Sequence, residues 1–451
     1  MPHQPFRSPR WFPLFVLFLV LSVCQTTEVL AASKKEKVVE KYETGEKKAE
    51  YFVKNDERTG PYTEYHLNGE LKVKARYIRG KLDGEYVEYH ANGVSKFSVK
   101  YRNGLRNGPF LERDENSDPV AKGNYDRGKL DGPYLTYRRA RPEKPHAFEE
   151  GVLVKFLGKK VHPRDLDTMT EAIQEIHKQK VNFKSASPEL LAAWHRLQTY
   201  RYLCGVNANV KLIEKRCNLA EDEADILADQ KPEHVTAAYP QHQAVKIPDE
   251  IDPPTTAAGI DAFMAHPGDS EKEPVLYRRQ CLNLRMEEVG IGSVGPYAAM
   301  SKDSISRLPG TDWKVVAHPA PGYTPVDYFS ADRPWSIMLN HKWYRSILEV
   351  KAFQVRPVLD NLTLGKRLEI GKRIEIRPLE EDPEVEPHYL LIFHPQGVNV
   401  APGQRYWVQV NGFHRKDGNI DTLEYLVEFT DPIDMDRKIK KKRKSRRKPR
   451  K

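Results

Sequence analysis

Cysteine is scarce in this chain, and its spacing excludes some classes of site. The 451 residues include four cysteines, and neither a CxxC pair nor a Cys/His zinc spacing occurs among them. This pattern disfavours a structural zinc ion. Three cysteines, Cys204, Cys217 and Cys281, follow the N-terminal segment. In an exported protein two of them can form a disulfide, and the odd count leaves one thiol over or pairs it between chains.

A hydrophobic run long enough to span a membrane is also lacking. The apolar run at residues 12–23 is shorter than the ~20 residues of a spanning helix. Two arginines precede it, and Val29-Leu30-Ala31 offers small residues to a signal peptidase. We therefore expect a signal peptide over residues 1–32 and an exported protein in the periplasm, on the cell surface or outside the cell. An uncleaved anchor and a lipoprotein site at Cys24 are the alternatives.

No motif of a catalytic nucleophile is present. The serines of residues 301–306 lie in a polar stretch without a Gly-x-Ser-x-Gly context. Cys281 follows Arg278-Arg279, which could lower the pKa of its thiol, but its neighbours form an apolar-bordered strand pattern. The two arginines are interpreted more simply as a solvated edge or a local ion pair. We therefore predict no catalytic residue and no cofactor.

Excess positive charge is absent outside the C-terminal tail. The formal net charge is +10, but residues 437–451 hold 12 Lys or Arg and no acid, which leaves −2 for the rest. Such a run repels itself and buries no apolar area, so residues 433–451 are predicted to be disordered. Behind a signal peptide, anionic envelope polymers or lipids are expected partners rather than nucleic acid, and a merely solubilising tail is the alternative. The residues expected to bind are Lys440, Lys441, Lys442, Arg443, Arg446 and Arg447.

A 24-residue repeat is the strongest pattern that is present. Gly60, Gly84, Gly108 and Gly132 each open a phrase such as Gly-Pro-Tyr-Thr-Glu-Tyr. Asn-Gly pairs separate stretches that alternate apolar and polar residues, as half-buried strands do. Each repeat is therefore predicted to be a β-hairpin stacked on the next one. Gly84 and Gly108 are expected in turns with positive φ.

The repeated phrase, Asn-Gly followed by Tyr-x-x-Gly-x-x-(Asn/Asp)-Gly-x-(Tyr/Phe), resembles the bacterial variant of the MORN repeat (membrane occupation and recognition nexus) over residues 37–140. The resemblance implies an open, elongated β-meander that acts as a scaffold for proteins or anionic lipids. The aromatic columns are a candidate binding surface, and the alternative is that they form the core of the ribbon. These candidates are Tyr62, Tyr86, Phe110 and Tyr134.

A predicted linker, residues 141–164, separates the repeats from a helical region. Ser187-Pro188-Glu189 supplies an N-cap, a proline at the first helical position and an early acid, and apolar residues follow at helical spacing. A second helix is predicted across residues 217–228, which carry Ala and Leu on one face and acids on the other.

Residues 194–205 (WHRLQTYRYLCG), 276–283 (LYRRQCLN), 289–292 (VGIG) and 295–300 (GPYAAM) resemble a bacterial CAP domain, and residues 317–325 and 335–340 extend the match. CAP is the superfamily of cysteine-rich secretory, antigen 5 and pathogenesis-related proteins. The resemblance covers residues 165–346. It implies an α-β-α sandwich made for the extracellular space.

The cavity of that family usually carries two His and two acidic residues that can hold a divalent cation. One His normally precedes the Arg of a Gly-His-Arg phrase, where this chain has Leu276-Tyr277-Arg278. Tyrosine does not replace a neutral nitrogen ligand. His234 is a weak candidate for the other His. The resemblance therefore implies a degenerate domain, and we predict that it binds no metal.

Short alternating runs separated by turn residues fill residues 347–432. They include residues 389–393, 406–410 and 423–429, and they predict five or more strands in a β-sandwich of immunoglobulin type. Residues 401–408 (APGQRYWV) also resemble the strand-entry phrase of small β-domains that follow bacterial CAP domains.

These features predict a multidomain, secreted or cell-envelope binding or scaffold protein without catalytic activity, which engages proteins or anionic envelope partners. Its order would be an all-β array of hairpins, a CAP-like α+β domain, an immunoglobulin-like β-sandwich and a basic tail. No transmembrane helix would remain after signal cleavage. The alternative is a CAP-family hydrolase or metal-dependent enzyme that acts on envelope material.

Overall fold

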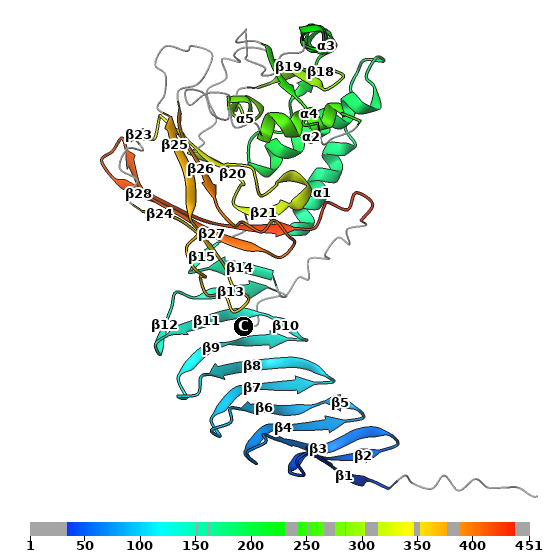
Figure 1. Ribbon diagram of the computed structural model, residues 1–451, viewed down its shortest axis with the longest axis vertical. Helices are drawn as coiled ribbons and strands as arrows, with labels where there is room; N and C mark the ends of the chain where they lie inside the picture. The colour runs from blue at the N-terminus through cyan, green and yellow to red at the C-terminus, as the bar shows by residue number, and fades with distance from the viewer. Residues whose placement is uncertain are drawn as a thin grey trace, which may run out of the picture.

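The computed structural model describes residues 34–149, 152–160, 163–230, 242–249, 253–265, 276–284, 286–302, 314–346, 352–376 and 388–437. A long β-array projects from a body made of two β-sheets and a helical region (Figure 1). The predicted signal peptide, residues 1–32, lies outside the described residues. No helix in the described ranges has both the length and the apolar character needed to cross a membrane.

The 24-residue repeat forms one antiparallel sheet whose main strands follow the order of the chain. The predicted hairpin is confirmed, because residues 84–89 and 95–102 are paired strands that flank Asn92-Gly93. The strands of this sheet, called the array below, are β1 (Glu36–Lys41), β2 (Lys47–Lys54), β3 (Glu57–Tyr65), β4 (Leu71–Ile78), β5 (Lys81–Leu82), β6 (Gly84–Tyr89), β7 (Ser95–Arg102), β8 (Leu105–Arg113), β9 (Pro119–Asp126), β10 (Lys129–Leu130), β11 (Gly132–Arg138), β12 (Arg141–Pro142), β13 (His146–Glu149), β14 (Val152–Phe156) and β15 (Lys159–Lys160).

Asparagine side chains join neighbouring hairpins of the array at their tips. Asn68 Nδ2 donates to the carbonyl oxygen of Ala91 at 2.9 Å, and Asn92 Nδ2 donates to that of Glu115 at 2.8 Å. The Oδ1 atom of Asn92 also accepts from the backbone N–H of Val94 at 3.1 Å, within its own turn. The asparagine of the Asn-Gly pair therefore closes its own hairpin and binds the next one.

The repeat glycines have the predicted positive φ, 109° at Gly84 and 104° at Gly108. Their location differs from the prediction, because Gly84 begins β6 and Gly108 lies within β8. Tyr101 pairs with Arg106 whereas Val99 pairs with Phe110, so extra residues of β8 bulge around Gly108. Glycine is used here to bend a strand rather than to close a turn.

The segment expected to be a linker, residues 141–164, instead contains β12 to β15 and continues the same sheet. Phe148, Leu153 and Phe156 are buried, which gives these short strands an apolar side. At the start of this segment β12 pairs with the end of β11 and forms a short hairpin.

The helical region is built on a four-stranded sheet with the order β16-β18-β19-β17. On one face Ala220 and Ala224 of α3 pack against Ala299, and on the other Leu197 and Phe263 from α2 and α4 share a core with Met300. The layers are therefore helix, sheet, helix. The strands are β16 (Lys211–Leu212), β17 (His242–Lys246), β18 (Glu288–Val294) and β19 (Tyr297–Lys302), and the helices are α1 (Leu166–His177), α2 (Pro188–Leu203), α3 (Glu214–Gln230), α4 (Thr256–Ala265) and α5 (Leu276–Cys281).

Both predicted helices are confirmed. Ser187 caps α2, and its hydroxyl accepts from the N–H of Leu190 at 3.1 Å. The second helix, α3, begins three residues before the predicted start at Cys217.

Two further sheets pack face to face. One has the order β20-β22-β26-β25; the other has the order β21-β28-β27-β23, with β24 on β27. The predicted strands at residues 389–393, 406–410 and 423–429 are confirmed within β26, β27 and β28. The elements are β20 (Val315–His318), β21 (Gly322–Pro325), η1 (Val326–Tyr328), β22 (Trp335–Asn340), β23 (Tyr344–Ser346), β24 (Ala352–Pro357), β25 (Ile370–Ile376), β26 (His388–Pro395), β27 (Arg405–Arg415) and β28 (Ile420–Thr430).

The boundary expected at residue 346 is displaced, because β20 to β23 belong to these two sheets. Every residue of β22 is buried. Ile337 and Leu339 face the space between the sheets, whereas Met338 faces the core of the helical region. A strand that is buried on both faces lacks the alternation that would mark it as part of a sandwich.

The second sheet connects the body to the array. Trp407 of β27 and Leu426 of β28 share a core with Leu153 and Phe156 of β14. The ring centroids of Phe156 and Trp407 lie 5.2 Å apart. Array, two sheets and helical region therefore follow one another along the long axis (Figure 1).

The chain after β28 binds α1. Gln174 Nε2 donates to the carbonyl oxygens of Asp434, Met435 and Arg437 at 3.0, 3.2 and 3.0 Å. Arg437 Nη2 lies 2.8 Å from Asp167 Oδ1. Residues 433–437, expected to be disordered, are thus held on a helix, and the remainder of the predicted tail lies outside the described residues.

Candidate functional site

The four aromatic residues predicted as a binding surface lie in one row across the array. Strand register aligns Tyr62 with Ala75, both Tyr86 and Phe110 with Val99, and Phe110 with Gly123. The Tyr134 ring also lies next to Gly123, 3.2 Å from the position of an added Cβ atom. Large aromatic side chains thus alternate with small residues. A Cβ atom added at Gly123 would lie 2.8 Å from the Phe110 ring, so the aromatic ring occupies the space that a larger residue would need.

Burial along this aromatic row falls toward the outer end of the array. Phe110 and Tyr134 are buried, whereas Tyr62 and Tyr86 are half-buried. Burial raises the pKa of Tyr134 to about 12 and also raises that of Tyr86, so both phenols are neutral at physiological pH. The inner half of the row is core, and the outer half is available for contact.

Two exposed arginines, two repeats apart, lie on the aromatic rings of this face. The Arg58 guanidinium is 4.7 Å from the ring centroid of Tyr51. Arg106 Nε donates to the Tyr101 hydroxyl at 3.2 Å, and its Nη1 donates to the Tyr125 hydroxyl at 3.1 Å. These cations occupy the faces of the rings, which leaves a surface suited to anionic groups rather than to another cation.

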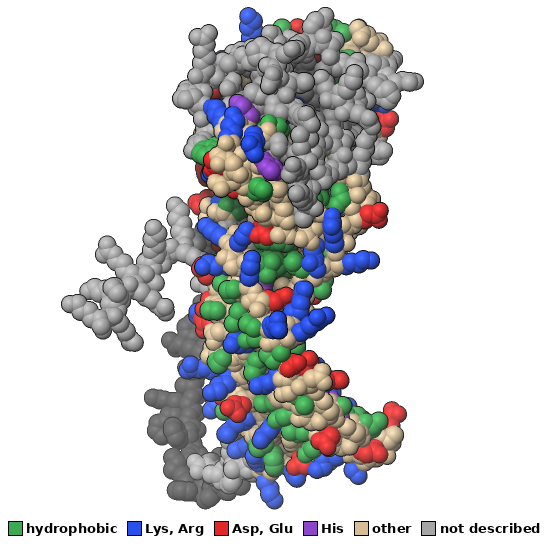
Figure 2. Space-filling view, turned by 90° about the vertical axis from the view of Figure 1, so that its left-hand side faces the viewer, with side chains coloured by type: hydrophobic (Ala, Val, Ile, Leu, Met, Phe, Trp, Pro, Cys, Tyr) green, Lys and Arg blue, Asp and Glu red, His purple; other side chains and the backbone are tan. Residues whose placement is uncertain are grey.

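Hydrophobic side chains also run along the array between basic and acidic ones on the side drawn in Figure 2. The array therefore exposes apolar and charged side chains together on this side.

His146 lies where the array meets the body, and it is 1% exposed. Its Nδ1 accepts from the N–H of Leu157 at 3.3 Å, and its ring centroid lies 4.8 Å from that of Phe156 with the two rings tilted by 40°. Burial lowers the pKa of this imidazole from 6.5 to about 4, although Glu143 acts in the opposite direction. The folded protein therefore holds His146 neutral.

Acid is expected to weaken this junction. Because the folded-state pKa is lowered, stabilisation by neutral His146 is complete above about pH 6.5 and is lost as the pH falls toward 4. The expected loss is about 1.4 kcal/mol per pH unit in that window. Urea unfolding of the intact protein at pH 7 and pH 5 would measure it, with His146→Gln as the non-titrating control. An equal pH dependence in both proteins would contradict the assignment.

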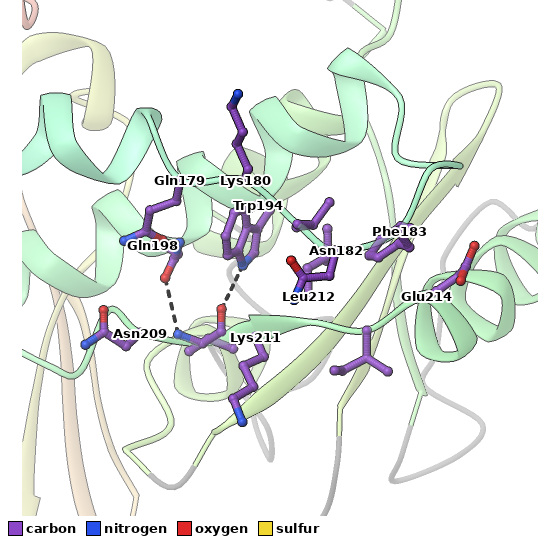
Figure 3. A pocket seen from close by; sticks show the side chains of 13 residues that line it. Gln179, Lys180, Asn182, Phe183, Trp194, Gln198, Asn209, Lys211, Leu212 and Glu214 are labelled. Carbon is purple, nitrogen blue, oxygen red and sulfur yellow. Dashed lines mark hydrogen bonds between the residues drawn. The ribbon is translucent and has the colours of Figure 1, made fainter.

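A pocket of about 640 Å³ lies beside the edge strand β16 (Figure 3). Trp194 and Gln198 of α2 contact Val210: the indole Nε1 donates to its carbonyl oxygen at 2.8 Å, and Gln198 Oε1 accepts from its N–H at 3.2 Å. The sequence placed Trp194 in a predicted helix and in the CAP-like segment, but it did not predict this pocket. The pocket is lined by Gln179, Lys180, Val181, Asn182, Phe183, Trp194, Gln198, Asn209, Val210, Lys211, Leu212, Ile213 and Glu214.

The three cysteines are free and buried, so the disulfide considered among them is not formed. The three cysteines lie on different helices: Cys217 is within α3, Cys281 is the last residue of α5, and Cys204 is the C-cap of α2. The sulfur of Cys204 lies 3.7 Å from Nδ1 of His318. Burial raises the pKa of Cys204 to about 12, which keeps its thiol protonated.

Arg278, interpreted from the sequence as solvated or ion-paired, is 1% exposed. Its guanidinium donates to the carbonyl oxygens of Met264 and Pro334 at 2.7 Å each and to the Ser336 hydroxyl at 3.0 Å. It thereby ties the helical region to β22. Burial lowers its pKa from 12.5 to about 9.

Tyr277 is buried, and its ring centroid lies 5.6 Å from that of Phe263. His234 and the tail residues 440–447 lie outside the described residues. Within the described ranges, no group of three or more His, Cys, Asp or Glu is arranged to hold a metal ion.

No protein-family model and no curated protein matches the chain. Among solved structures, the chain is similar to a cysteine-rich secretory protein from Staphylococcus aureus subsp. aureus Mu50. The two are 12% identical over 59% of this chain and 82% of that one, with a TM-score of 0.18. A likeness of this size leaves function to be argued from the chain's own residues.

Proposed function

We propose that this chain is an exported, non-catalytic binding or scaffold protein of the cell envelope. In this proposal the array is of the bacterial MORN type, the helical region is a degenerate CAP domain, and the paired sheets are an immunoglobulin-like module. The observation that carries the proposal is the aromatic face of the array, where exposed Arg58 lies over the rings of Tyr51 and Tyr62 and exposed Arg106 lies over the ring of Tyr125.

An array that projects from the body can lay its side chains along an extended partner. Arg58 and Arg106 place guanidinium groups at a spacing of two repeats on one face, and tyrosine hydroxyls lie beside them. Guanidinium groups bind carboxylates and phosphates through paired hydrogen bonds. The partner chemistry favoured by this face is therefore an anionic polymer or lipid surface of the envelope, or an acidic protein.

The proposed absence of catalysis is supported by the packing of Tyr277. Its side chain fills core space against Phe263, where the CAP family has a ligand that faces its cavity. The protonated, buried thiol of Cys204 is likewise a poor nucleophile.

Binding to anionic vesicles tests the proposal. We expect the intact protein to bind phosphatidylglycerol–phosphatidylcholine vesicles and to release them as salt rises, because physiological salt screens interactions between exposed charges that are more than ~8–10 Å apart and higher salt shortens that distance. Arg58→Gln with Arg106→Gln is expected to weaken binding. A second variant, the truncated protein, lacks the basic tail. Its deletion begins at residue 438, so that the contact between Arg437 and Asp167 stays intact.

Lys74→Gln with Lys100→Gln is the matched control, since both lysines are exposed and neighbour Ala75 and Val99 of the aromatic row in sequence. Their side chains therefore lie on the opposite face of the sheet. Equal losses from both double variants would show that binding follows net charge alone. Full affinity in both the arginine variant and the truncated protein would refute the proposal.

A further inference from the structure

In the four-stranded sheet of the helical region, β16 is an edge strand, and one of its sides pairs with no other strand among the described residues. Lys211 N–H donates to Glu287 O at 2.8 Å, and Ile213 N–H donates to Val289 O at 2.9 Å. Because backbone groups alternate along a strand, those of Val210 and Leu212 point away from β18. Both residues line the pocket drawn in Figure 3.

At Val210, but not at Leu212, side chains make the hydrogen bonds that a neighbouring strand would make. The carboxamide of Gln198 and the indole of Trp194 take both backbone groups of Val210. The backbone N–H and C=O of Leu212 have no partner among the described residues. Such a pair is a template for one further strand.

The pocket has the dimensions and the lining for a short extended segment. Its volume of about 640 Å³ lies within the usual range for ligand sites. Asn182 and Asn209 supply amide groups that can bond to a peptide backbone, and Phe183 and Trp194 supply apolar surface. Backbone pairing gives affinity in this mode of recognition, and side-chain pockets give specificity.

Charge selects among peptides. Lys180 and Lys211 extend from the two walls (Figure 3), whereas Glu214, the acid in the lining, accepts a hydrogen bond from Ser185. The lining is thus net positive. We propose that the pocket binds an extended, acidic peptide segment of a partner protein, which adds a strand to β16 by pairing with Leu212. This inference does not depend on what the array binds.

Amide exchange at single-residue resolution tests the pairing directly. The probe is the capped peptide Glu-Thr-Val-Thr-Val-Thr-Glu added to the intact protein. We expect the Leu212 amide to exchange freely without peptide and to become protected at least about tenfold with it, because it gains an acceptor. The amides of Lys211 and Ile213, which already have acceptors, are the internal controls. Binding of the peptide without protection of Leu212 would overturn the proposal.

Two changes separate backbone pairing from charge. The same peptide with every Thr and Val amide N-methylated keeps its charge but loses the N–H donors of its five central residues, and we expect it not to bind. Lys211→Glu is expected to weaken binding of the acidic peptide by about tenfold and to favour a version with Lys in place of Glu. Lys211 is exposed, so this variant should fold. Equal binding of the methylated peptide, or no binding of either peptide at millimolar concentration, would refute the inference.

Discussion

Replacing Gly290 by alanine should destabilise the helical region by about 3 kcal/mol or more, because helix α3 lies directly on the backbone of β18. A Cβ atom at Gly290 would lie 2.0 Å from the carbonyl carbon of Arg216, and one at Gly292 would lie 2.3 Å from the backbone nitrogen of Glu221. These obstacles are backbone atoms, so no side chain can move aside and the helix itself must shift. Gly292→Ala is expected to have an effect of similar size.

Denaturant unfolding of the intact protein, followed by circular dichroism, measures this loss. Gly295→Asn is the control: a Cβ there meets nothing within 4 Å, and its φ of 54° is one that asparagine tolerates. We expect that variant to stay within about 0.5 kcal/mol of the parent protein. A Gly290→Ala protein as stable as its parent would contradict the packing of α3 on β18.

Replacing Phe156 by alanine should separate the unfolding of the array from that of the body. The Phe156 side chain is fully buried between His146 and Trp407, with ring centroids 4.8 and 5.2 Å away. Removal of a buried phenylalanine costs about 3–5 kcal/mol, since it leaves a cavity. Phe156 belongs to the array and Trp407 to the body, so the loss of this contact lowers the stability of β14 and also weakens the coupling between array and body.

Scanning calorimetry is the appropriate measurement, with limited proteolysis to identify the part that opens first. In Phe156→Ala we expect the array to melt at a lower temperature than the body. Val152→Ala changes an exposed side chain of the same strand and should leave the melting profile unchanged. A Phe156→Ala profile identical to that of the parent would show that the junction does not couple the two parts.

Local signals in the sequence were sufficient for the repeat and for several single elements. The 24-residue period predicted the hairpins, and Ser187-Pro188-Glu189 predicted the start of α2, because turn and cap chemistry act over a few residues. The boundaries between the parts of the molecule could not be predicted from such local signals. The short strands at residues 146–156 have only a few apolar positions, and β22 is buried on both faces, so neither shows a clear alternation of apolar and polar residues.

Long-range contacts explain what the sequence did not show at the candidate sites. Arginine is usually found on the surface, so the sequence suggests an exposed side chain at Arg278. Its burial depends on three hydrogen-bond acceptors, on Met264, Pro334 and Ser336, which are distant in the sequence. The unfilled edge at Leu212 depends on β18, more than 70 residues later, and on the loop at residues 179–183. The aromatic row, in contrast, was visible from the period alone, although its division into core and contact halves was not.

The outermost strand of the array, β1, has consequences for self-association. It reads Glu-Lys-Val-Val-Glu-Lys and pairs with β2 on one side. If two copies joined β1 edge to edge about a two-fold axis normal to the sheet, residues of the same parity would face each other. Centring the pair on Val38 places Glu36 opposite Glu40, and centring it on Val39 places Lys37 opposite Lys41. Like charges directly opposite are destabilising. The charge order of this strand therefore works against the pairing of two identical arrays through β1, while a strand with another charge pattern would meet no such repulsion.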